Sequence, residues 1–107
     1  MLPDAFCEGE TGMVAYVIAD AEILDPVKYE EYKKLTPGAI AKHGGRFLAR
    51  GGQTAVLEGS WRPNRVVIIE FPSLEAARNF YTSVEYTAAR RARAGAAAMN
   101  IIAVDGA

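Results

Sequence analysis

Apolar residues occupy both alternating faces of two extended segments of the chain. Residues 14–19 and 65–71 are rich in β-branched and aromatic side chains, which favour β-strands. Two shorter apolar runs, residues 46–50 and 100–104, also have the length and composition of strands. The pattern therefore predicts four strands, and we expect extended structure to resume over residues 54–58 beyond a Gly-Gly break.

A helix is predicted between the first two strands. Asp25 is a good N-cap, and Pro26 is favoured in the first helical turn. We expect the pair Thr36-Pro37 to kink or break this helix, because proline lacks the N–H that bonds four residues back. Gly44-Gly45 is expected to end the helix after His43, with a glycine in the left-handed conformation.

A second helix is predicted after the strand at 65–71, with Ser73 as its N-cap. Its apolar side chains recur at positions i, i+3, i+4 and i+7, as in an amphipathic helix: Ala77, Phe80, Tyr81 and Val84. We expect Ser83 to start a further helical segment over residues 84–94. The order of elements is β-α-β-β-α-β, which is typical of the ferredoxin-like α+β fold, an antiparallel sheet with two helices on one face.

The sheet face that points away from the helices is also predicted to be apolar. Val66 and Ile68 would lie on one face of their strand, and Val67 and Ile69 on the other. A sheet covered on one side normally alternates apolar with polar residues. We therefore expect a second copy of the chain to cover the uncovered face in a two-fold homodimer. The alternative is a monomer whose face is shielded by residues 51–64 and the N-terminal arm.

Several motifs, taken in order, resemble one protein family. They are Asp25-Pro26 with Tyr29 and Tyr32, His43-Gly44-Gly45-Arg46, Gly51-Gly52, Leu57-Glu58-Gly59-Ser60-Trp61, Val67 to Ser73, and Phe80-Tyr81 with Ser83 to Tyr86. Over about residues 13–106 the chain resembles the thirteen-thirty family of domains of unknown function, which belongs to the dimeric α/β-barrel superfamily. The resemblance implies a ferredoxin-like subunit whose sheet packs against a second subunit to form a barrel. It implies no reaction, because the family has none assigned.

Composition narrows the possible functions. The chain has 107 residues, with 12 Lys and Arg against 13 Asp and Glu and a formal net charge of −1. We expect neither a nucleic-acid nor a membrane partner, because the sequence has no strong basic excess and no long apolar run. One cysteine and one histidine offer few metal ligands. No phosphate-binding glycine motif is present, so we expect neither a metal nor a cofactor.

The first twelve residues differ from the rest of the sequence. Residues 1–12 contain proline, glycine and acidic side chains without periodicity. We expect them to form a flexible extension ahead of a single domain at 13–107, with Met13 as an alternative start. They have neither the basic start nor the apolar stretch of a secretory signal, and a single cysteine forms no internal disulfide, so a cytoplasmic location is expected.

Two residues are candidates for acid–base chemistry. His43 could carry a proton, ligate haem, or act as a cation at the helix C-terminus. Glu58, at the end of a predicted strand and near Trp61, could carry a proton or form an ion pair with Arg46, Arg50 or Arg65. Our hypothesis is that His43 and Glu58 are the proton carriers if the protein is an enzyme. Whether it is one stays open.

Aromatic residues predict a small-molecule pocket between the sheet and the helices. The candidate ligand-binding residues are Tyr16, Tyr32, Arg46, Trp61 and Tyr81. Phenol and indole groups suit a small aromatic or carbonyl-containing ligand. The alternative is that the tyrosines are core residues and that Trp61 anchors a subunit contact. We expect a homodimer that binds a small organic molecule, with a non-catalytic ligand sensor or assembly dimer as the alternative.

Overall fold

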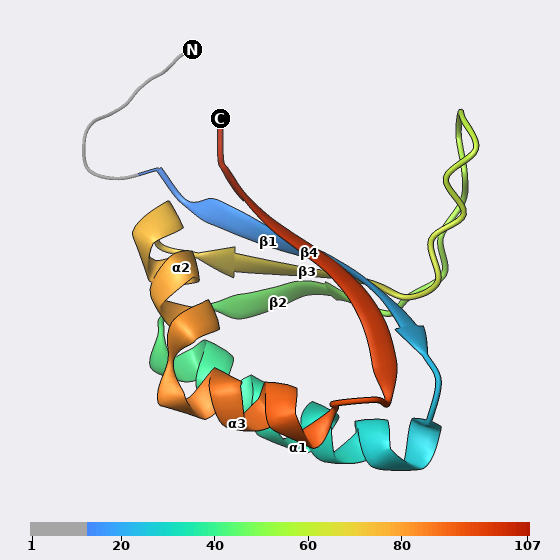
Figure 1. Ribbon diagram of the computed structural model, residues 1–107. Coiled ribbons are helices and arrows are strands. Elements are labelled where there is room, and N and C mark those ends of the chain that lie inside the picture. Colours follow the sequence, from blue (N-terminus) through green and yellow to red (C-terminus); the bar gives the residue numbers. More distant parts are fainter. Residues whose placement is uncertain (1–12) are drawn as a thin grey trace.

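Four antiparallel strands form one sheet, and three helices lie on one of its faces (Figure 1). The computed structural model describes residues 13–107, so the predicted flexible extension at 1–12 lies outside the described residues. In chain order the elements are β1 (Ala15–Ile23), α1 (Pro26–Lys42), β2 (Arg46–Arg50), β3 (Val66–Phe71), α2 (Leu74–Thr82), α3 (Val84–Ala92) and β4 (Ala97–Asp105).

The sheet topology confirms the predicted ferredoxin-like fold. The strand order is β2-β3-β1-β4, and every neighbouring pair is antiparallel. The central strands pair with Ile18 opposite Ile68. The strands β1 and β4 are longer than predicted, since they pair along nine residues, from Ala15 opposite Asp105 to Ile23 opposite Ala97. The predicted second helix consists of two segments, α2 and α3, as expected.

The predicted helix caps are confirmed. The Asp25 side chain accepts a hydrogen bond from the Lys28 N–H at 3.1 Å. Ser73 and Ser83 cap α2 and α3 in the same way. At the end of α1, Gly44 has a φ of 78°, which is the left-handed conformation that favours glycine.

Of the kink or break predicted at Thr36-Pro37, the break is wrong, because α1 continues through Pro37. Two side chains stabilise the helix where the proline N–H is missing. The Thr36 hydroxyl donates to the Tyr32 carbonyl at 2.7 Å. The carbonyl four residues before Pro37 belongs to Lys33, and Arg50 of β2 donates to it at 3.3 Å. A partner from the sheet therefore replaces the lost backbone hydrogen bond.

The strand expected at residues 54–58 is also wrong. These residues lie in an exposed loop that connects β2 to β3 and projects from one end of the sheet (Figure 1). Asp20 of β1 holds the base of this loop: it accepts hydrogen bonds from the backbone of Asn64 at 2.8 Å and from the Trp61 indole at 3.2 Å. A segment without a neighbouring strand cannot form the backbone hydrogen bonds of a sheet. The strand-like composition of residues 54–58 is therefore not sufficient to produce a strand here.

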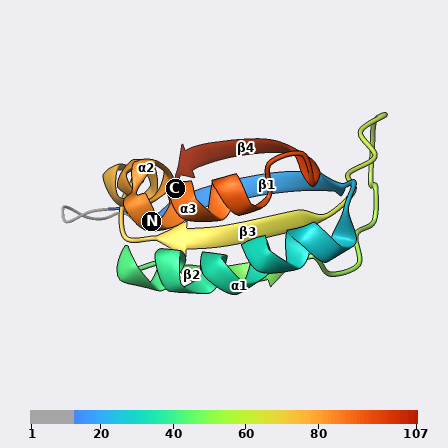
Figure 2. The same ribbon diagram turned by 60° about the horizontal axis from the view of Figure 1, so that its bottom comes forward.

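Alternate strand residues pack against the helices and form the core. On the sheet side these include Val17, Ala19, Val67, Ile69 and Phe71, and on the helix side Tyr29, Tyr32, Ile40, Phe80 and Tyr86. The aromatic contacts are closest beneath α2, where the ring centroids of Phe71 and Phe80 lie 4.9 Å apart and those of Phe80 and Tyr86 lie 4.3 Å apart. The helix layer is seen in front of the sheet in Figure 2.

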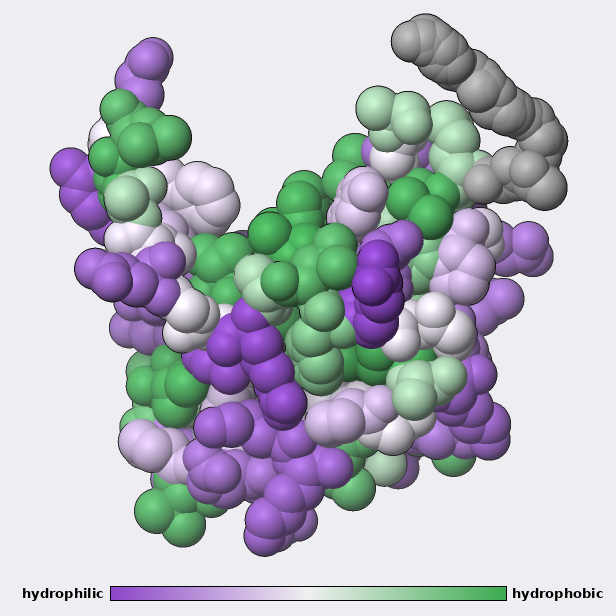
Figure 3. Space-filling model, turned by 180° about the vertical axis from the view of Figure 1, so that it is seen from behind, coloured by the Kyte–Doolittle hydropathy of each residue, from purple (hydrophilic) through white to green (hydrophobic). Residues whose placement is uncertain are grey.

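The opposite face of the sheet carries a second apolar set. By alternation along β1, β3 and β4, this uncovered face presents Tyr16, Ile18, Val66, Ile68, Ile102 and Val104. Ile102 is 61% exposed and Val104 is 45% exposed. Figure 3 shows apolar side chains gathered in the hollow between the projecting loop and the opposite end of the sheet. The predicted absence of apolar–polar alternation is therefore confirmed in the folded chain.

Candidate functional site

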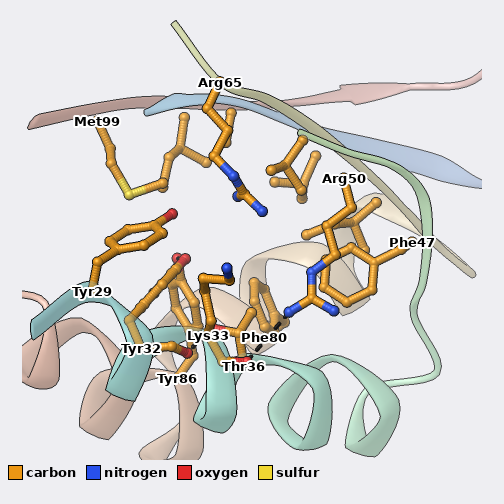
Figure 4. A pocket seen from close by; sticks show the side chains of 15 residues that line it. Tyr29, Tyr32, Lys33, Thr36, Phe47, Arg50, Arg65, Phe80, Tyr86 and Met99 are labelled. Atoms are coloured by element: carbon orange, nitrogen blue, oxygen red, sulfur yellow. Dashed lines mark hydrogen bonds between the residues drawn. The ribbon is translucent and has the colours of Figure 1, made fainter. Parts of the chain in front are cut away.

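The sheet and the helix layer enclose a gap that opens on two sides. One cavity lies between α1 and the sheet (Figure 4), with a volume of about 30 Å³, which is room for about two water molecules. A second cavity, between α2 and β4, has a volume of about 780 Å³. The two cavities share four apolar lining residues, Val17, Phe80, Met99 and Ile101. We call the two together the interlayer gap.

Three cationic side chains surround the α1 opening of the interlayer gap (Figure 4). Lys33 comes from α1, Arg50 from the end of β2 and Arg65 from the residue before β3. The Arg50 guanidinium lies 4.4 Å from the Phe47 ring centroid, and the Arg65 guanidinium lies 5.9 Å from that of Tyr29. Lys33 is ion-paired with Glu30 on the outer surface of α1 at 3.2 Å. No carboxylate lines this cavity in the described part of the chain.

Phenol groups supply the polar atoms inside the gap. The Tyr32 and Tyr86 hydroxyls form a buried hydrogen bond of 2.6 Å. The Tyr29 hydroxyl is buried and has no hydrogen-bond partner among the described residues. Burial raises the pKa of Tyr29, and burial together with the Tyr86 phenol raises the pKa of Tyr32. Tyr29 and Tyr32 therefore keep their phenol protons at neutral pH and can donate hydrogen bonds.

The second opening, at the larger cavity, is also lined by cationic and phenolic side chains. Arg78 and Tyr81 of α2 line it, together with Arg93, which follows α3. The Arg93 guanidinium lies 5.2 Å from the Tyr32 ring centroid, so this cation reaches toward the middle of the gap. Arg90 packs over the Tyr81 ring at 4.4 Å.

His43 lies at the C-terminus of α1 and outside the lining of both cavities. Its ring packs edge-on against Phe80, and its buried Nε2 atom lies 3.7 Å from a carboxylate oxygen of Glu85. A hydrogen bond from Lys42 is the main cause that lowers the pKa of Glu85. This environment fits the helix-terminal alternative for His43, in which its ring stabilises the junction of α1 with α3.

We predict that His43→Gln lowers stability and leaves ligand binding intact. The expected loss is about 0.5–1 kcal/mol in the free energy of unfolding, because the substitution removes the ring that packs against Phe80 at the end of α1. Urea denaturation measures the loss. If His43 were a proton carrier, the variant would instead keep its stability and lose turnover of any substrate found.

Glu58 and Trp61 lie on the projecting loop, and neither lines the cavities of the interlayer gap. Both are exposed, and Trp61 is held by its hydrogen bond to Asp20. Glu58 makes no ion pair with the described residues. Of the three arginines suggested as its partners, Arg46 pairs with Glu70 at 2.9 Å, and Arg50 and Arg65 line the α1 opening of the interlayer gap. The structure does not bring Glu58 and His43 into a shared cavity.

The five candidate ligand-binding residues occupy three places. Tyr32 and Tyr81 line the interlayer gap. Tyr16 and Arg46 lie on the uncovered face of the sheet, where both neighbour Glu70 across the strands. Trp61 lies on the loop. The pocket predicted between sheet and helices thus has two of the five residues in its lining.

Four polar lining residues were missed by sequence reasoning: Tyr29, Lys33, Arg50 and Arg65. A pattern on α1 could have found two of them, because Tyr29, Tyr32, Lys33 and Thr36 recur at i, i+3, i+4 and i+7 and so share one helix face. The two arginines lie at adjacent ends of neighbouring strands, and their proximity depends on the register of β2 against β3.

Two further features of residues 13–107 bear on function. They contain no group of three or more His, Cys, Asp or Glu side chains positioned to hold a metal ion. None of their helices is both long enough and apolar enough to cross a membrane.

The fold and the gap define a ferredoxin-like α+β protein with cavities between its sheet and its helices. Residues 14–107 match the model of a domain of unknown function, DUF1330, and the chain belongs to that family. The resemblance deduced from the sequence is therefore confirmed. No curated protein shows significant similarity to the chain.

Solved structures share the fold at low sequence identity. A protein of unknown function from Rhodopseudomonas palustris is 17% identical, with a TM-score of 0.71 over 91% of this chain and 85% of that one. A cofactor-independent oxygenase from Streptomyces nogalater is 15% identical, with a TM-score of 0.56 over 91% and 95% of the two chains. A dimeric ferredoxin-like protein of unknown function from Bacteroides fragilis is 18% identical, with a TM-score of 0.54 over 90% and 98%.

Proposed function

We propose that this protein is a homodimeric α/β barrel that binds a small organic molecule in the interlayer gap. The observation that carries the proposal is the gap itself, which has apolar walls, two openings and a buried, unpaired Tyr29 hydroxyl. Ligand sites typically combine mainly apolar walls with a few directed polar groups and have volumes of about 300–1,000 Å³. The larger cavity, at about 780 Å³, falls within this range.

The uncovered face of the sheet supports the dimer. Its apolar side chains lie on the two central strands and on β4, and a continuous apolar surface on a small protein is typical of an interface. A second copy presents the same surface, so a two-fold axis lets the two sheets cover each other. The dimeric Bacteroides fragilis protein with this fold is consistent with such an assembly.

Binding is better supported than catalysis. The two candidate proton carriers, His43 and Glu58, lie outside the lining of the gap. Burial raises the pKa of the Tyr29 and Tyr32 phenols inside the gap. At neutral pH these two phenols therefore donate hydrogen bonds and do not act as bases. A ligand-sensing dimer without catalysis therefore agrees with the geometry better than a cofactor-free acid–base enzyme does.

Native mass spectrometry of protein purified from cells tests both parts of the proposal. We expect a species of twice the 11.5 kDa chain mass, with a small additional mass that is lost under denaturing conditions. A thermal-shift screen of small organic compounds then identifies ligands, because a compound that binds the folded state raises Tm. A monomer contradicts the dimer, and a screen without any stabilising compound contradicts ligand binding.

A further inference from the structure

We propose that the interlayer gap takes an organic anion, specifically a small carboxylate with an apolar body. The carboxylate would lie between Arg50 and Arg65 and accept a hydrogen bond from the Tyr29 hydroxyl. The inference rests on the proposed binding of a small molecule and adds the chemical class of that molecule.

Charge is distributed very unevenly between the gap and the rest of the surface. Five of the twelve Lys and Arg residues line the two cavities: Lys33, Arg50, Arg65, Arg78 and Arg93. Among residues 13–107, by contrast, no Asp or Glu residue lines either cavity. The net charge of the chain is nevertheless −1. A cleft with one sign of charge and low-dielectric walls concentrates ligands of the opposite sign.

Arg65 is positioned by its surroundings. Its backbone N–H donates to Asp20, and its carbonyl accepts from the Ala21 N–H at 2.9 Å. Its guanidinium packs against Gly51, where a Cβ atom would lie 2.7 Å from the Arg65 Nε atom. Only a residue without a side chain leaves that space, so the β2 end of the loop accommodates the arginine. Neither Arg50 nor Arg65 forms an ion pair with a carboxylate within residues 13–107.

Tyr29 supplies the second polar contact. Its side chain is 1% exposed, and its hydroxyl points into the gap (Figure 4). A buried hydroxyl without a partner costs free energy, and a bound acceptor removes that cost. Because burial raises its pKa, the phenol keeps its proton and donates to a carboxylate. A guanidinium and a phenol together complement the two oxygens of a carboxylate.

The shared wall of the gap defines the rest of the ligand. Val17, Phe80, Met99 and Ile101 line both the cavity at the cationic opening and the larger cavity. Apolar side chains contribute nothing to an inorganic anion, but they bury an alkyl or aryl group favourably. The Arg50 side chain is exposed, so a ligand can reach its guanidinium from solvent.

The test compares an acid with its uncharged isostere. The probes are 4-phenylbutyrate, its primary amide and inorganic phosphate, each titrated into the full chain at constant ionic strength and followed by NMR. We expect the acid to bind at least about tenfold more tightly than the amide, because hydrogen bonds to charged groups exceed neutral ones by about that factor. Phosphate should bind more weakly than the acid, since it lacks an apolar body.

Variants locate the site. Arg65→Gln should weaken binding of the acid about tenfold and leave binding of the amide unchanged. Tyr29→Phe should weaken it several-fold while retaining the ring in the core. Arg91→Gln removes the same charge from an exposed position outside both cavities and should change nothing. If Arg65→Gln does not fold, Arg50→Gln, at an exposed side chain, gives the same comparison.

The outcomes separate this inference from the proposed function. Equal binding of acid and amide, or an Arg65→Gln variant that folds and binds the acid normally, overturns the carboxylate site but leaves small-molecule binding intact. Phosphate binding as tight as that of the acid overturns the role of the apolar wall. No binding of the acid overturns the carboxylate site, and the thermal-shift screen then decides separately whether the gap binds another small molecule.

Discussion

Ile68→Lys should convert the dimer to a monomer at micromolar concentration. Ile68 lies on central strand β3 opposite Ile18, in the middle of the uncovered sheet face. In the proposed dimer, the new ammonium group would be buried against the partner's apolar face without a counter-charge. Such burial costs several kcal/mol per ion, so we expect the dissociation constant to rise at least about 100-fold. Multi-angle light scattering over a dilution series measures the change.

Val27→Lys is the matched control for this experiment. Val27 is 84% exposed near the start of α1, so the same new charge there stays in water and away from the sheet. Circular dichroism distinguishes dissociation from unfolding, since the monomer exposes a second apolar surface and is expected to be less stable. Wild-type protein that scatters as a folded 11.5 kDa species, or Ile68→Lys protein that remains dimeric, contradicts the sheet-to-sheet dimer.

The fold was predictable because its signals are local and mutually consistent. The apolar run at 65–71 and the capping residues Asp25, Ser73 and Ser83 each determine an element within a few residues of their position. The lack of alternation on the strands also predicted an uncovered apolar face. Elements whose formation depends on nearby residues are the ones a sequence pattern identifies best.

The two errors in the fold arose from contacts between distant residues. Proline normally interrupts a helix, but Arg50 crosses from β2 to bond the Lys33 carbonyl. The segment at 54–58 has strand composition, but no strand edge is paired with it. The helix therefore depends on a residue that is distant in the sequence, and the missing strand reflects the lack of a neighbouring strand to pair with.

The sequence predicted the location of the candidate site but only part of the residues that line it. A gap between the sheet and the helices was expected, and Tyr32 and Tyr81 line it. Its cationic groups were not anticipated, because Arg50 and Arg65 are 15 positions apart in the sequence and meet at one opening through the β2–β3 pairing. A lining assembled from four strands and three helices has no contiguous motif.

The same glycine-to-alanine substitution should have opposite effects at two positions near the end of α1. At Gly45, an added Cβ would lie 2.6 Å from a Phe71 ring carbon and 2.8 Å from the Ile40 Cγ2 atom, and both side chains are buried. Overpacking of this kind costs about 1–3 kcal/mol, so Gly45→Ala should lower Tm by roughly 5–20 °C.

Gly38→Ala is the control of opposite sign. Gly38 lies inside α1, is exposed and has no atom within 4 Å of an added Cβ. Alanine at such a position lowers the conformational entropy of the unfolded chain and stabilises a helix by about 0.5–1 kcal/mol. Differential scanning calorimetry of both variants should therefore give Tm values on opposite sides of the wild type. A Gly45→Ala protein as stable as the wild type would mean that Phe71 and α1 pack less closely than the structure shows.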